Sequence, residues 1–530
     1  MTWEFISERI RTLIENKIRQ PTSDNDALNQ SQINAINTIW RASTRPPRWN
    51  RNPIGVTLDE FVQPQSTIFR YLFANWTHQV FSSYIIIGPP GTGKTTVIAY
   101  GALRYISDPQ YRPDLIPRVF ICTSSNFGAD RVFEKIREIL YDNNIEGWEI
   151  YIKRIIAQSV SEEDLSELVR GYTIRPFPLS NEDSVTHRQQ LENALILVGT
   201  IYACEDLFSL ERPIRSQTVL FDEASQLTPP QMYLPIARNR SIRSFGLIGD
   251  NCQLPPIVSL EPLTHSCIDY MRGLPEYQNS RIPENRQITL NIQYRMHPAI
   301  RDISGRFARR NIIIRDGPNV LLRSHLLQNY EMPDNLRLFH DVLNNIFNPE
   351  KTVVIIDYSR LGEIGLDTRV ISSRINISEI NIIRGLILLF RDFYPNFEAT
   401  NENLKIIAPY KQQAIRLRNI TGYNANTVDA FQGQEAAVVF YSLTFAEPDI
   451  RSRFFQNIHR IHVGLSRAQK KLIVIGHSEA LSHPHFIMLR QNIFNYNYNE
   501  NLEENVSLGY IPVSRLPLTQ DFYEYLLSLN

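Results

Sequence analysis

The sequence has 530 residues, 43% hydrophobic and 21% charged, which excludes an intrinsically disordered chain and predicts several globular domains. Lysine plus arginine number 55, as do aspartate plus glutamate, so the net charge neither predicts nor excludes a polyanionic partner. No C-x₂₋₄-C spacing occurs among the four cysteines, which argues against a structural zinc site and a disulfide framework: Cys122, Cys204, Cys252 and Cys267.

The N-terminal stretch predicts an amphipathic helix. Residues 1–18 carry acidic residues throughout and lack the apolar centre of a secretory signal. No run in the chain approaches the roughly 18 apolar residues of a membrane span. We therefore expect an intracellular protein, cytoplasmic or nuclear, with no membrane partner.

Short apolar runs that end in polar or glycine clusters predict buried parallel strands. They lie at residues 84–88, 118–126, 195–200, 218–225 and 245–250, and again at 353–357, 404–410, 437–444 and 472–477. Helical patterns alternate with them, as at 131–140 and 377–393. This alternation predicts an α/β fold with two parallel sheets flanked by helices, whose ligands bind at the carboxyl ends of the strands.

The two groups of strands predict two main domains. We expect an N-terminal helix at 1–27, a first domain at 28–286, a second domain at 287–480 and a C-terminal extension at 481–530. The first domain carries two expected insertions. The one at about 41–83 includes the basic, aromatic stretch WRASTRPPRWNRN, which suits either an exposed loop or a nucleic-acid contact. The one at about 141–187 predicts a small helical subdomain.

The sequence GPPGTGKT at 88–95 predicts a phosphate-binding loop, because it follows a strand and precedes a helix. Its glycines let backbone N–H groups turn toward phosphate oxygens at a helix N-terminus. Lys94 is expected to reach the β- and γ-phosphates, and Thr95 to ligate Mg²⁺. The loop alone does not separate a kinase, a GTPase, an AAA+ machine or a helicase.

Polar residues after the next strands predict hydrolysis. In FDEASQ, Asp222 suits holding Mg²⁺ through water and Glu223 suits a general base for the attacking water. In GDNCQLPP, Gln253 suits orienting that water or contacting the γ-phosphate. Surface acids at a strand end are the alternative interpretation for the two carboxylates.

Two arginines in the second half suit transition-state stabilisation. Arg295 lies in QYRMHP and Arg467 in VGLSRA. If both reach the γ-phosphate from the second sheet, hydrolysis opens and closes a cleft between two domains. Taken one at a time, each arginine would more often be a surface or salt-bridge residue.

Together these motifs resemble those of superfamily 1 helicases of the up-frameshift-like branch, which includes the nonsense-mediated decay helicase, senataxin and nidovirus helicases. The matching stretches run in order from Leu28 to Ala468: LNQSQINAI, GPPGTGKTT, TSSNFGADRVFEKI, ILVGTIYACED, FDEASQ, GDNCQLPP, QYRMHP, APYKQQ, TVDAFQGQE and VGLSRA. The resemblance implies two RecA-like P-loop domains, ATP and Mg²⁺ as cofactors, and 5′→3′ movement on single-stranded RNA or DNA.

The resemblance also implies residue roles. Gln32 would read the adenine edge, Tyr294 would stack on the adenine, and Glu435 would contact the ribose. The phosphates would lie against Gly88, Pro89, Pro90, Gly91, Thr92, Gly93, Lys94, Thr95 and Thr96, with Gln253, Arg295 and Arg467 around the γ-phosphate. The strand would contact Ser124, Ser125, Asn126, Thr200, Pro409, Tyr410 and Thr427, for which ordinary loop capping is the alternative.

Relatives often carry a β-barrel and accessory domains before the glutamine motif, whereas about 27 residues precede LNQSQ here. We therefore expect the nucleic-acid contacts of the barrel to be missing or to be replaced by the segment at 41–83. Three other functions remain open: a nucleic-acid-stimulated ATPase that remodels ribonucleoprotein without unwinding, a binding module with an inactive motor, and an unrelated P-loop enzyme. The motor is expected to act as a monomer, and neither RNA nor DNA is favoured.

Overall fold

The computed structural model describes residues 2–19, 28–44, 55–57, 80–108, 116–177, 184–239, 241–258, 265–273, 287–308, 313–318, 320, 333, 339–365, 368–370, 373–395, 397, 400–431, 433–446, 457–481, 495–496, 509–510 and 514–529. The chain divides into two compact units, Met1–Asn251 with Pro255–Ile292, and Cys252–Leu254 with Gln293–Asn530. Most of the expected insertion at 41–83 lies outside the described residues.

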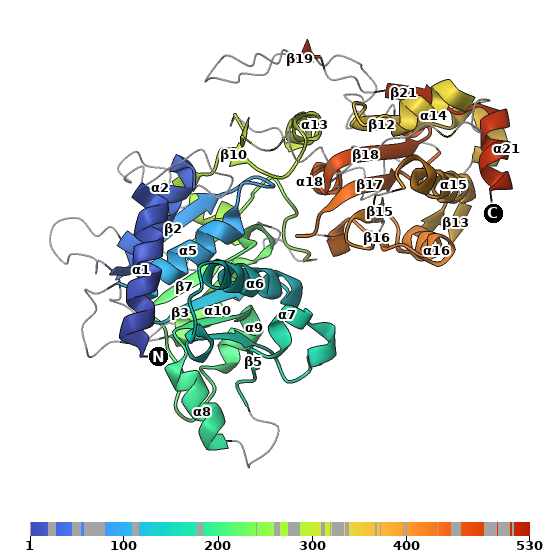
Figure 1. The fold of residues 1–530 in the computed structure, drawn as a ribbon. Helices are drawn as coiled ribbons and strands as arrows, with labels where there is room; N and C mark the ends of the chain where they lie inside the picture. The colour runs from blue at the N-terminus through green and yellow to red at the C-terminus, as the bar shows by residue number, and fades with distance from the viewer. Residues whose placement is uncertain are drawn as a thin grey trace. The chain divides into compact units, whose positions relative to one another are not determined.

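The first unit is built on a largely parallel sheet (Figure 1). Its order is β1 (Gly55–Thr57), β2 (Val80–Ile87), β8 (Ser244–Gly249), β7 (Thr218–Phe221), β3 (Val119–Thr123), β6 (Ile196–Thr200), β4 (Ile152–Ile155) and β5 (Thr173–Ile174), and β9 (Gln287–Thr289) also pairs with β2. Among the described strand pairs of this sheet, only β1–β2 is antiparallel. Strands β3, β7 and β8 are buried along their whole length, as expected when helices cover both faces.

Helices on the two faces of this sheet contribute to two separate cores. Ile86, Ile121 and Val198 point to one face, where they pack with α1 (Trp3–Arg19), α2 (Gln30–Thr44), α5 (Lys94–Ile106) and α6 (Asn126–Asp142). Their neighbours in sequence point to the other face, toward α9 (Ile201–Asp206), α10 (Pro229–Arg238) and α11 (Cys267–Gly273). Within the expected N-terminal segment, α1 buries Ile6, Ile10 and Ile14 at the spacing of one helical face, as an amphipathic helix does.

The segment at 141–187 differs from the helical subdomain that we expected. It contains short helices, namely η1 (Trp148–Ile150), η2 (Glu162–Asp164), α7 (Glu167–Arg170) and the start of α8 (Ser184–Asn193), but it also supplies β4 and β5. Both strands pair in parallel and extend the first sheet beyond β6. They are four and two residues long, too short to give a periodic signal in the sequence.

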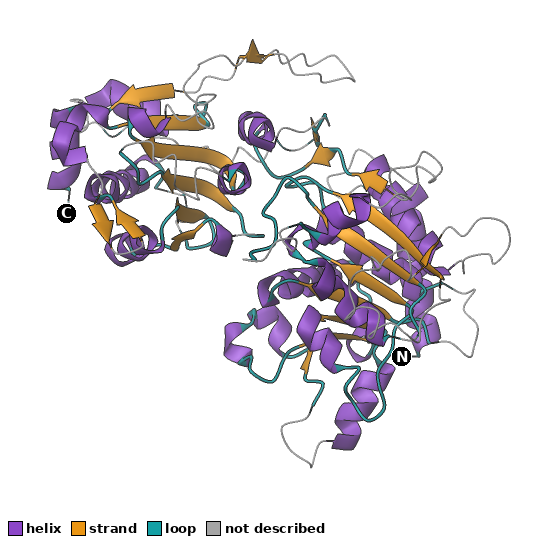
Figure 2. Ribbon diagram, turned by 180° about the vertical axis from the view of Figure 1, so that it is seen from behind, coloured by secondary structure: helices purple, strands orange, loops and turns teal. Residues whose placement is uncertain are grey.

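The second unit holds a parallel sheet in the order β16 (Ala425–Thr427), β15 (Leu404–Ala408), β17 (Ala436–Ser442), β18 (Ala468–Gly476), β12 (Val353–Asp357) and β21 (Ser514–Pro517). One face packs against α14 (His340–Phe347), α15 (Ile377–Phe393), α16 (Lys411–Thr421) and α21 (Gln520–Ser528). The other packs against α13 (Pro298–Ala308) and α18 (Ile458–Leu465). Figure 2 shows helices on both faces of the strands in each unit.

The C-terminal segment is more than the extension that we expected, because β21 completes the second sheet beside β12 and α21 packs on α15. A Cβ atom on Gly385 would lie within 3.0 Å of the Leu526 side chain, so a glycine permits this close approach. The remaining short elements are β10 (Ile292–Gln293) with β11 (Arg315–Asp316), β13 (Thr368–Val370) with β14 (Ser373–Ile375), β19 (Asn495–Tyr496) with β20 (Gly509–Tyr510), η3 (Ala224–Gln226), η7 (Ser359–Gly365), η8 (Asp429–Phe431) and α19 (Ser478–Leu481).

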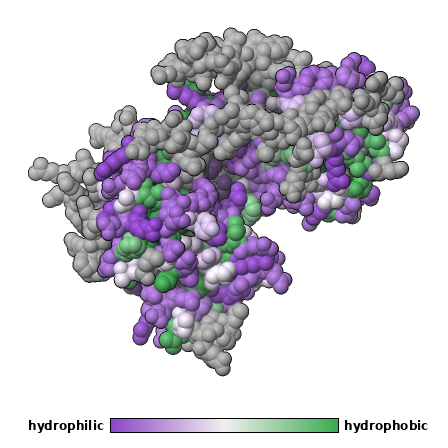
Figure 3. All heavy atoms as spheres, viewed as in Figure 1, coloured by the Kyte–Doolittle hydropathy of each residue, from purple (hydrophilic) through white to green (hydrophobic). Residues whose placement is uncertain are grey.

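The predicted fold class is confirmed. All nine apolar runs form strands, and each of the two sheets is flanked by helices. Among the described helices, none is both long and apolar enough to cross a membrane. Figure 3 shows a described surface that is mostly hydrophilic on this face, with hydrophobic residues scattered over it.

Candidate nucleotide and nucleic-acid site

The loop between β2 and α5 has the geometry of a phosphate cradle. Gly91 and Gly93 adopt positive φ angles of 76° and 83°, a region that favours glycine. A Cβ atom on Gly88 would overlap the side chain of Lys94, so that position also requires glycine. Lys94 donates from Nζ to the carbonyl oxygen of Gly88 at 2.9 Å, which keeps the ammonium group at the loop. The remaining loop residues lie around it, with Pro89, Pro90 and Thr92 buried and Thr95 and Thr96 half-buried.

Gln32 is held against this loop from α2. Its Nε2 donates to the carbonyl oxygen of Thr92 at 3.1 Å, and its Oε1 accepts the backbone N–H of Asn29 at 3.1 Å. Its side chain fills the space beside Gly93, where a Cβ atom would overlap the amide nitrogen. The structure thus brings Gln32 to the phosphate loop, 60 residues away in sequence.

Asp222 and Glu223 follow β7 at the carboxyl edge of the first sheet. Burial, and after it the Glu223 carboxylate, raise the pKa of Asp222 to about 7, whereas Lys94 acts in the opposite direction. The Asp222 carboxylate therefore lies within electrostatic reach of the phosphate loop. Glu223 adopts a left-handed backbone with φ of 51°, which is uncommon for a residue with a side chain and marks a locally constrained position.

Gln226 links Glu223 to the neighbouring strand end. Its Nε2 donates to Glu223 Oε2 at 3.4 Å, and its Oε1 accepts from Ser124 Oγ at 3.4 Å. The sequence contained this residue within FDEASQ, but nothing in the pattern gave it a role. The link requires β3 and β7 to be adjacent, which only the sheet order reveals.

The predicted strand contacts of the first unit lie at the ends of β3 and β6. Ser124 and Ser125 are exposed and Asn126 is half-buried. Ser125 and Thr200 are also N-caps, accepting the backbone N–H groups of Gly128 at 3.1 Å and Ala203 at 3.3 Å. The capping interpretation therefore holds for both hydroxyls, and it leaves their second lone pair available to a ligand.

A buried arginine fixes this edge from the 141–187 segment. Arg154 on β4 has no solvent exposure and donates from Nη2 to Asn126 Oδ1 at 3.0 Å. Its Nε donates to Asp130 Oδ1 at 2.8 Å, which forms a buried ion pair. Through Arg154, this segment anchors the first turns of α6.

Gln253 belongs to the second unit, although we expected it in the first domain. It is buried, and Leu254 beside it packs in the core that contains Met296. His459 on α18 lies with Nδ1 at 2.9 Å from the Cys252 carbonyl oxygen. This segment therefore packs with the core of the second unit.

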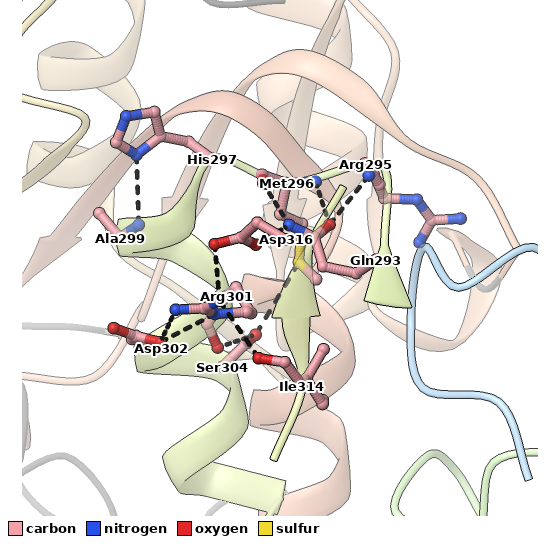
Figure 4. A network of polar contacts seen from close by, with 10 residues as sticks. All are labelled: Gln293, Arg295, Met296, His297, Ala299, Arg301, Asp302, Ser304, Ile314 and Asp316. Atoms are coloured by element: carbon pink, nitrogen blue, oxygen red, sulfur yellow. Dashed lines mark hydrogen bonds and ion pairs between the residues drawn. The ribbon is translucent and has the colours of Figure 1, made fainter. Parts of the chain in front are cut away.

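The loop that carries Tyr294 and Arg295 is organised by a buried amide (Figure 4). Gln293 has no solvent exposure, and its Oε1 accepts the backbone N–H groups of Arg295 at 2.9 Å and Met296 at 2.8 Å. Its Nε2 donates to the Met296 carbonyl oxygen at 2.7 Å and to Asp316 Oδ1 at 2.5 Å.

The same network continues through Arg301, which donates to Asp316 Oδ2 at 2.6 Å and to Asp302 Oδ1 at 2.6 Å. Gln293, Asp316 and Arg301 thus form one connected hydrogen-bond network beneath the loop that carries Arg295. Burial, together with the Arg301 charge, lowers the pKa of His297 to about 4, so this ring is neutral at physiological pH. His297 Nδ1 accepts the backbone N–H of Ala299 at 3.2 Å.

Arg295 and Glu435 form an ion pair within the second unit. Gln469 donates from Nε2 to Glu435 Oε1 at 2.8 Å and so supports the carboxylate from β18. The Arg295 side chain is 19% exposed, which leaves part of the guanidinium accessible. The ring of Tyr294 lies against Gly317, where a Cβ atom would overlap it. The structure therefore brings together three residues that the sequence predicts at the nucleotide.

Arg467 is buried inside the second unit, with 2% exposure. Its Nε donates to the Val463 carbonyl oxygen and its Nη1 to the Gln434 carbonyl oxygen, both at 2.9 Å. The side chain thus joins the end of α18 to the loop that precedes Glu435. A role at a γ-phosphate requires the guanidinium to reach out of this setting.

The predicted strand contacts of the second unit follow β15 and β16. Pro409 and Tyr410 come directly after β15, and Thr427 ends β16, which pairs with β15 in parallel. The Tyr410 ring meets Phe445 edge to face at 5.3 Å. All three residues are half-buried, at the edge where parallel strands end.

Two family models, each described as an AAA domain, match residues 74–177 and 274–479. The first match includes the phosphate loop, and the second includes Tyr294, Arg295, Glu435 and Arg467. Among solved structures, an Arterivirus nonstructural protein 10 (helicase) in complex with DNA is similar over 74% of this chain and 60% of its own, with 13% identity and a TM-score of 0.36.

Similar curated proteins are helicases by name. DNA polymerase alpha-associated DNA helicase A of Saccharomyces cerevisiae is 24% identical over 80% of this chain and 66% of its own length. ATP-dependent helicase NAM7 of the same organism is 24% identical over 75% of this chain and 40% of its own. Human DNA replication ATP-dependent helicase/nuclease DNA2 is 23% identical over 74% and 35%. The chain thus spans from about a third to just under two thirds of the length of these relatives.

The matches cover the phosphate loop of the first unit and the QYRMHP and VGLSRA motifs of the second. ATP-dependent helicase upf1 of Schizosaccharomyces pombe is 23% identical over 75% of this chain and 43% of its own length. The chain belongs to the up-frameshift-like branch of the superfamily 1 helicases.

Proposed function

We propose that this chain is an ATP-dependent nucleic-acid helicase or translocase that couples ATP hydrolysis to movement along single-stranded RNA or DNA in the 5′→3′ direction. The observation that carries the coupling is the hydrogen-bonded chain from Ser124 through Gln226 to Glu223. It joins a residue proposed to touch the strand to a residue proposed to activate water. A change at one end therefore has a direct physical path to the other.

The nucleotide part of the proposal rests on the phosphate loop. Backbone N–H groups of the loop and the N-terminus of α5 face the phosphates, and Lys94 supplies the positive charge. Gln32 binds the adenine edge from the side of Gly93. Tyr294, held against Gly317, stacks on the adenine, and Glu435 bonds the ribose.

The residues present fit Mg²⁺. The hydroxyl of Thr95 and the carboxylate of Asp222 are oxygen donors, the type that Mg²⁺ prefers. Burial and the Glu223 carboxylate raise the pKa of Asp222, so a cation bound at this carboxylate would favour its charged form. When bound, the ion neutralises phosphate charge that develops during transfer.

Hydrolysis then uses residues of both units. Glu223 takes the proton of the attacking water, which makes water a stronger nucleophile. Gln253 orients that water or contacts the γ-phosphate. Arg295 and Arg467 stabilise the charge that spreads over the transferring phosphoryl group. Because Arg295 pairs with Glu435 in this structure, engagement of the ribose by Glu435 would release Arg295 toward the phosphate.

The strand lies on polar groups that carry no sequence preference. Hydroxyl and amide groups at Ser124, Ser125, Asn126 and Thr200 bond phosphate oxygens. Pro409, Tyr410 and Thr427 provide the corresponding surface on the second unit.

A second candidate function is a nucleic-acid-stimulated ATPase that remodels ribonucleoprotein without separating a duplex. It shares every residue discussed above.

ATP hydrolysis by the purified chain, alone and with single-stranded RNA or DNA, tests the proposal. Strong stimulation by either polymer supports a coupled motor and names its track, whereas hydrolysis that ignores both contradicts coupling. A strand-displacement assay on duplexes with a 5′ or a 3′ single-stranded overhang then separates the candidates. Release only from the 5′ overhang supports a 5′→3′ helicase, and stimulation without release supports the remodelling ATPase.

A further inference from the structure

Two large aromatic rings are exposed beside the proposed strand contacts of the first unit. Phe127 is 40% exposed and Tyr202 is 57% exposed. Phe127 follows Asn126 in the first turn of α6, and Tyr202 lies two residues beyond Thr200 in α9. No interpretation of the motifs gave either ring a role.

The sheet brings the two rings to one edge. Strands β3 and β6 are parallel neighbours in which Thr123 is the register partner of Thr200. The helices that follow them cover opposite faces, because α6 packs into the core with α5 whereas α9 packs into the core with α10. One aromatic therefore stands on each side of the sheet edge that carries the exposed hydroxyls of Ser124 and Ser125.

Both rings sit on firmly anchored backbone. The Tyr202 hydroxyl accepts from Gln231 Nε2 at 3.3 Å, and Gln231 is itself fixed in the capping box of α10. Phe127 follows the N-cap Ser125, and Arg154 donates to the Asn126 carbonyl oxygen at 3.2 Å. Anchored rings lose little conformational entropy when a ligand stacks on them.

Two other exposed rings of the unit are in a different setting. Phe5 lies beneath the guanidinium of Arg9 at 5.9 Å, and Tyr141 beneath that of Arg137 at 5.7 Å. Each of those pairs is four residues apart on its own helix, which is an ordinary intrahelical contact. Tyr141 stands at the far end of α6 from Phe127, about 20 Å away along the helix axis.

We propose that Phe127 and Tyr202 are stacking platforms for nucleobases of the bound single strand, next to the groups that hold its phosphates. The assignment rests on the proposed function and deepens it by naming the base-contacting residues. Stacking uses the flat face that every base presents, so it adds affinity without reading sequence, and it works for RNA and DNA alike. This edge of the sheet would then bind a single strand through both its phosphates and its bases.

Fluorescence anisotropy with labelled single-stranded oligonucleotides tests this. F127A and Y202A are each expected to weaken binding of base-bearing RNA and DNA by roughly 5- to 100-fold. The leucine variants F127L and Y202L should lose affinity as the alanine variants do, because they keep an apolar side chain but lose the flat ring. Y202F should bind as wild type, and Y141A is the matched control for an exposed aromatic on the same helix.

An abasic DNA strand of equal length makes the test specific. Wild type should bind it more weakly than the base-bearing strand, and F127A and Y202A should match wild type on it within about twofold. The slope of log affinity against log salt should not change, because no phosphate contact is removed.

If the variants lose affinity equally for base-bearing and abasic strands, the stacking role is wrong. Unchanged affinity in the variants would also overturn it and would leave a protein as the ligand of this surface. If wild type binds neither RNA nor DNA, the proposed function fails as well. That result is distinct from wild-type binding that is indifferent to both rings.

Discussion

The side-chain oxygen of Gln293 accepts the backbone N–H of Arg295 at 2.9 Å, so a buried amide fixes the loop that carries this arginine. The same oxygen accepts the N–H of Met296, and the amide nitrogen reaches Asp316. The arginine proposed to meet the γ-phosphate is therefore positioned by a side chain two residues before it.

Replacement of Gln293 by leucine is expected to lower kcat for ATP hydrolysis by roughly 100-fold, because a shift of about 1 Å in a positioned group costs that much. The KM for ATP should change less, since the phosphate loop is untouched. Gln520→Leu, an exposed glutamine in the same unit, is the control. Wild-type kcat in a folded Gln293→Leu protein would show that Arg295 does not depend on this anchor.

Gln226→Leu should uncouple strand binding from hydrolysis, because it removes both hydrogen bonds between Ser124 and Glu223. We expect the ratio of strand-stimulated to basal ATPase activity to fall at least about fivefold, the lower range of coupling between sites. Single-strand affinity, measured without nucleotide, serves as the control and should stay near wild type. An unchanged ratio would remove Gln226 from the coupling path.

Lys94→Ala should abolish ATP hydrolysis, because the phosphates lose their main cationic partner. Initial rates of phosphate release would be compared with those of Lys135→Ala, a surface lysine of the same unit. Normal turnover in Lys94→Ala would contradict the phosphate-loop assignment.

Arg467→Ala is expected to cut turnover by roughly 10³-fold or more while nucleotide binding stays largely intact. Because the side chain also bonds the carbonyl oxygens of Val463 and Gln434, thermal unfolding must be measured alongside. The exposed Arg416→Ala is the matched control. Equal loss of nucleotide affinity and turnover would assign Arg467 to ground-state binding instead.

Lys471 gives the second unit a pH-dependent stability. Burial, and after it the charge of Lys351, lower the pKa of Lys471 from 10.5 to about 7, while its Nζ donates to two carbonyl oxygens at 2.9 and 3.0 Å. Between pH 7 and 10.5 the unfolded chain binds the proton that the folded chain lacks. The free energy of unfolding therefore rises with pH in this window.

Lys471→Met removes the titrating group. As pH rises from 7 to 9, the free energy of unfolding of the wild type should therefore increase relative to that of the variant. The shift should be about 1.4 kcal/mol per pH unit. Below pH 7 the difference should level off, because both states carry the proton. A difference that is independent of pH from 6 to 9 would contradict a buried neutral amine.

The sequence by itself determined the features that depend on local pattern. Apolar runs rich in isoleucine and valine predicted the strands of both sheets, and their polar ends predicted the edges where the motifs lie; both are observed. The α/β fold and the up-frameshift-like branch are confirmed. A contiguous loop such as residues 88–95 is readable because its chemistry lies within one turn of chain. The roles of the individual site residues stay predictions.

The tertiary structure decided what depends on residues far apart in the chain. The Arg295–Glu435 pair spans both halves of the second unit, and β21 joins β12 from the C-terminal end. Neither follows from periodicity, which reports only which face of its own helix or strand a residue occupies. Buried polar groups need hydrogen-bond partners, and packing of the layers determines which groups meet. The pair of Arg154 and Asn126 therefore forms only in the folded structure.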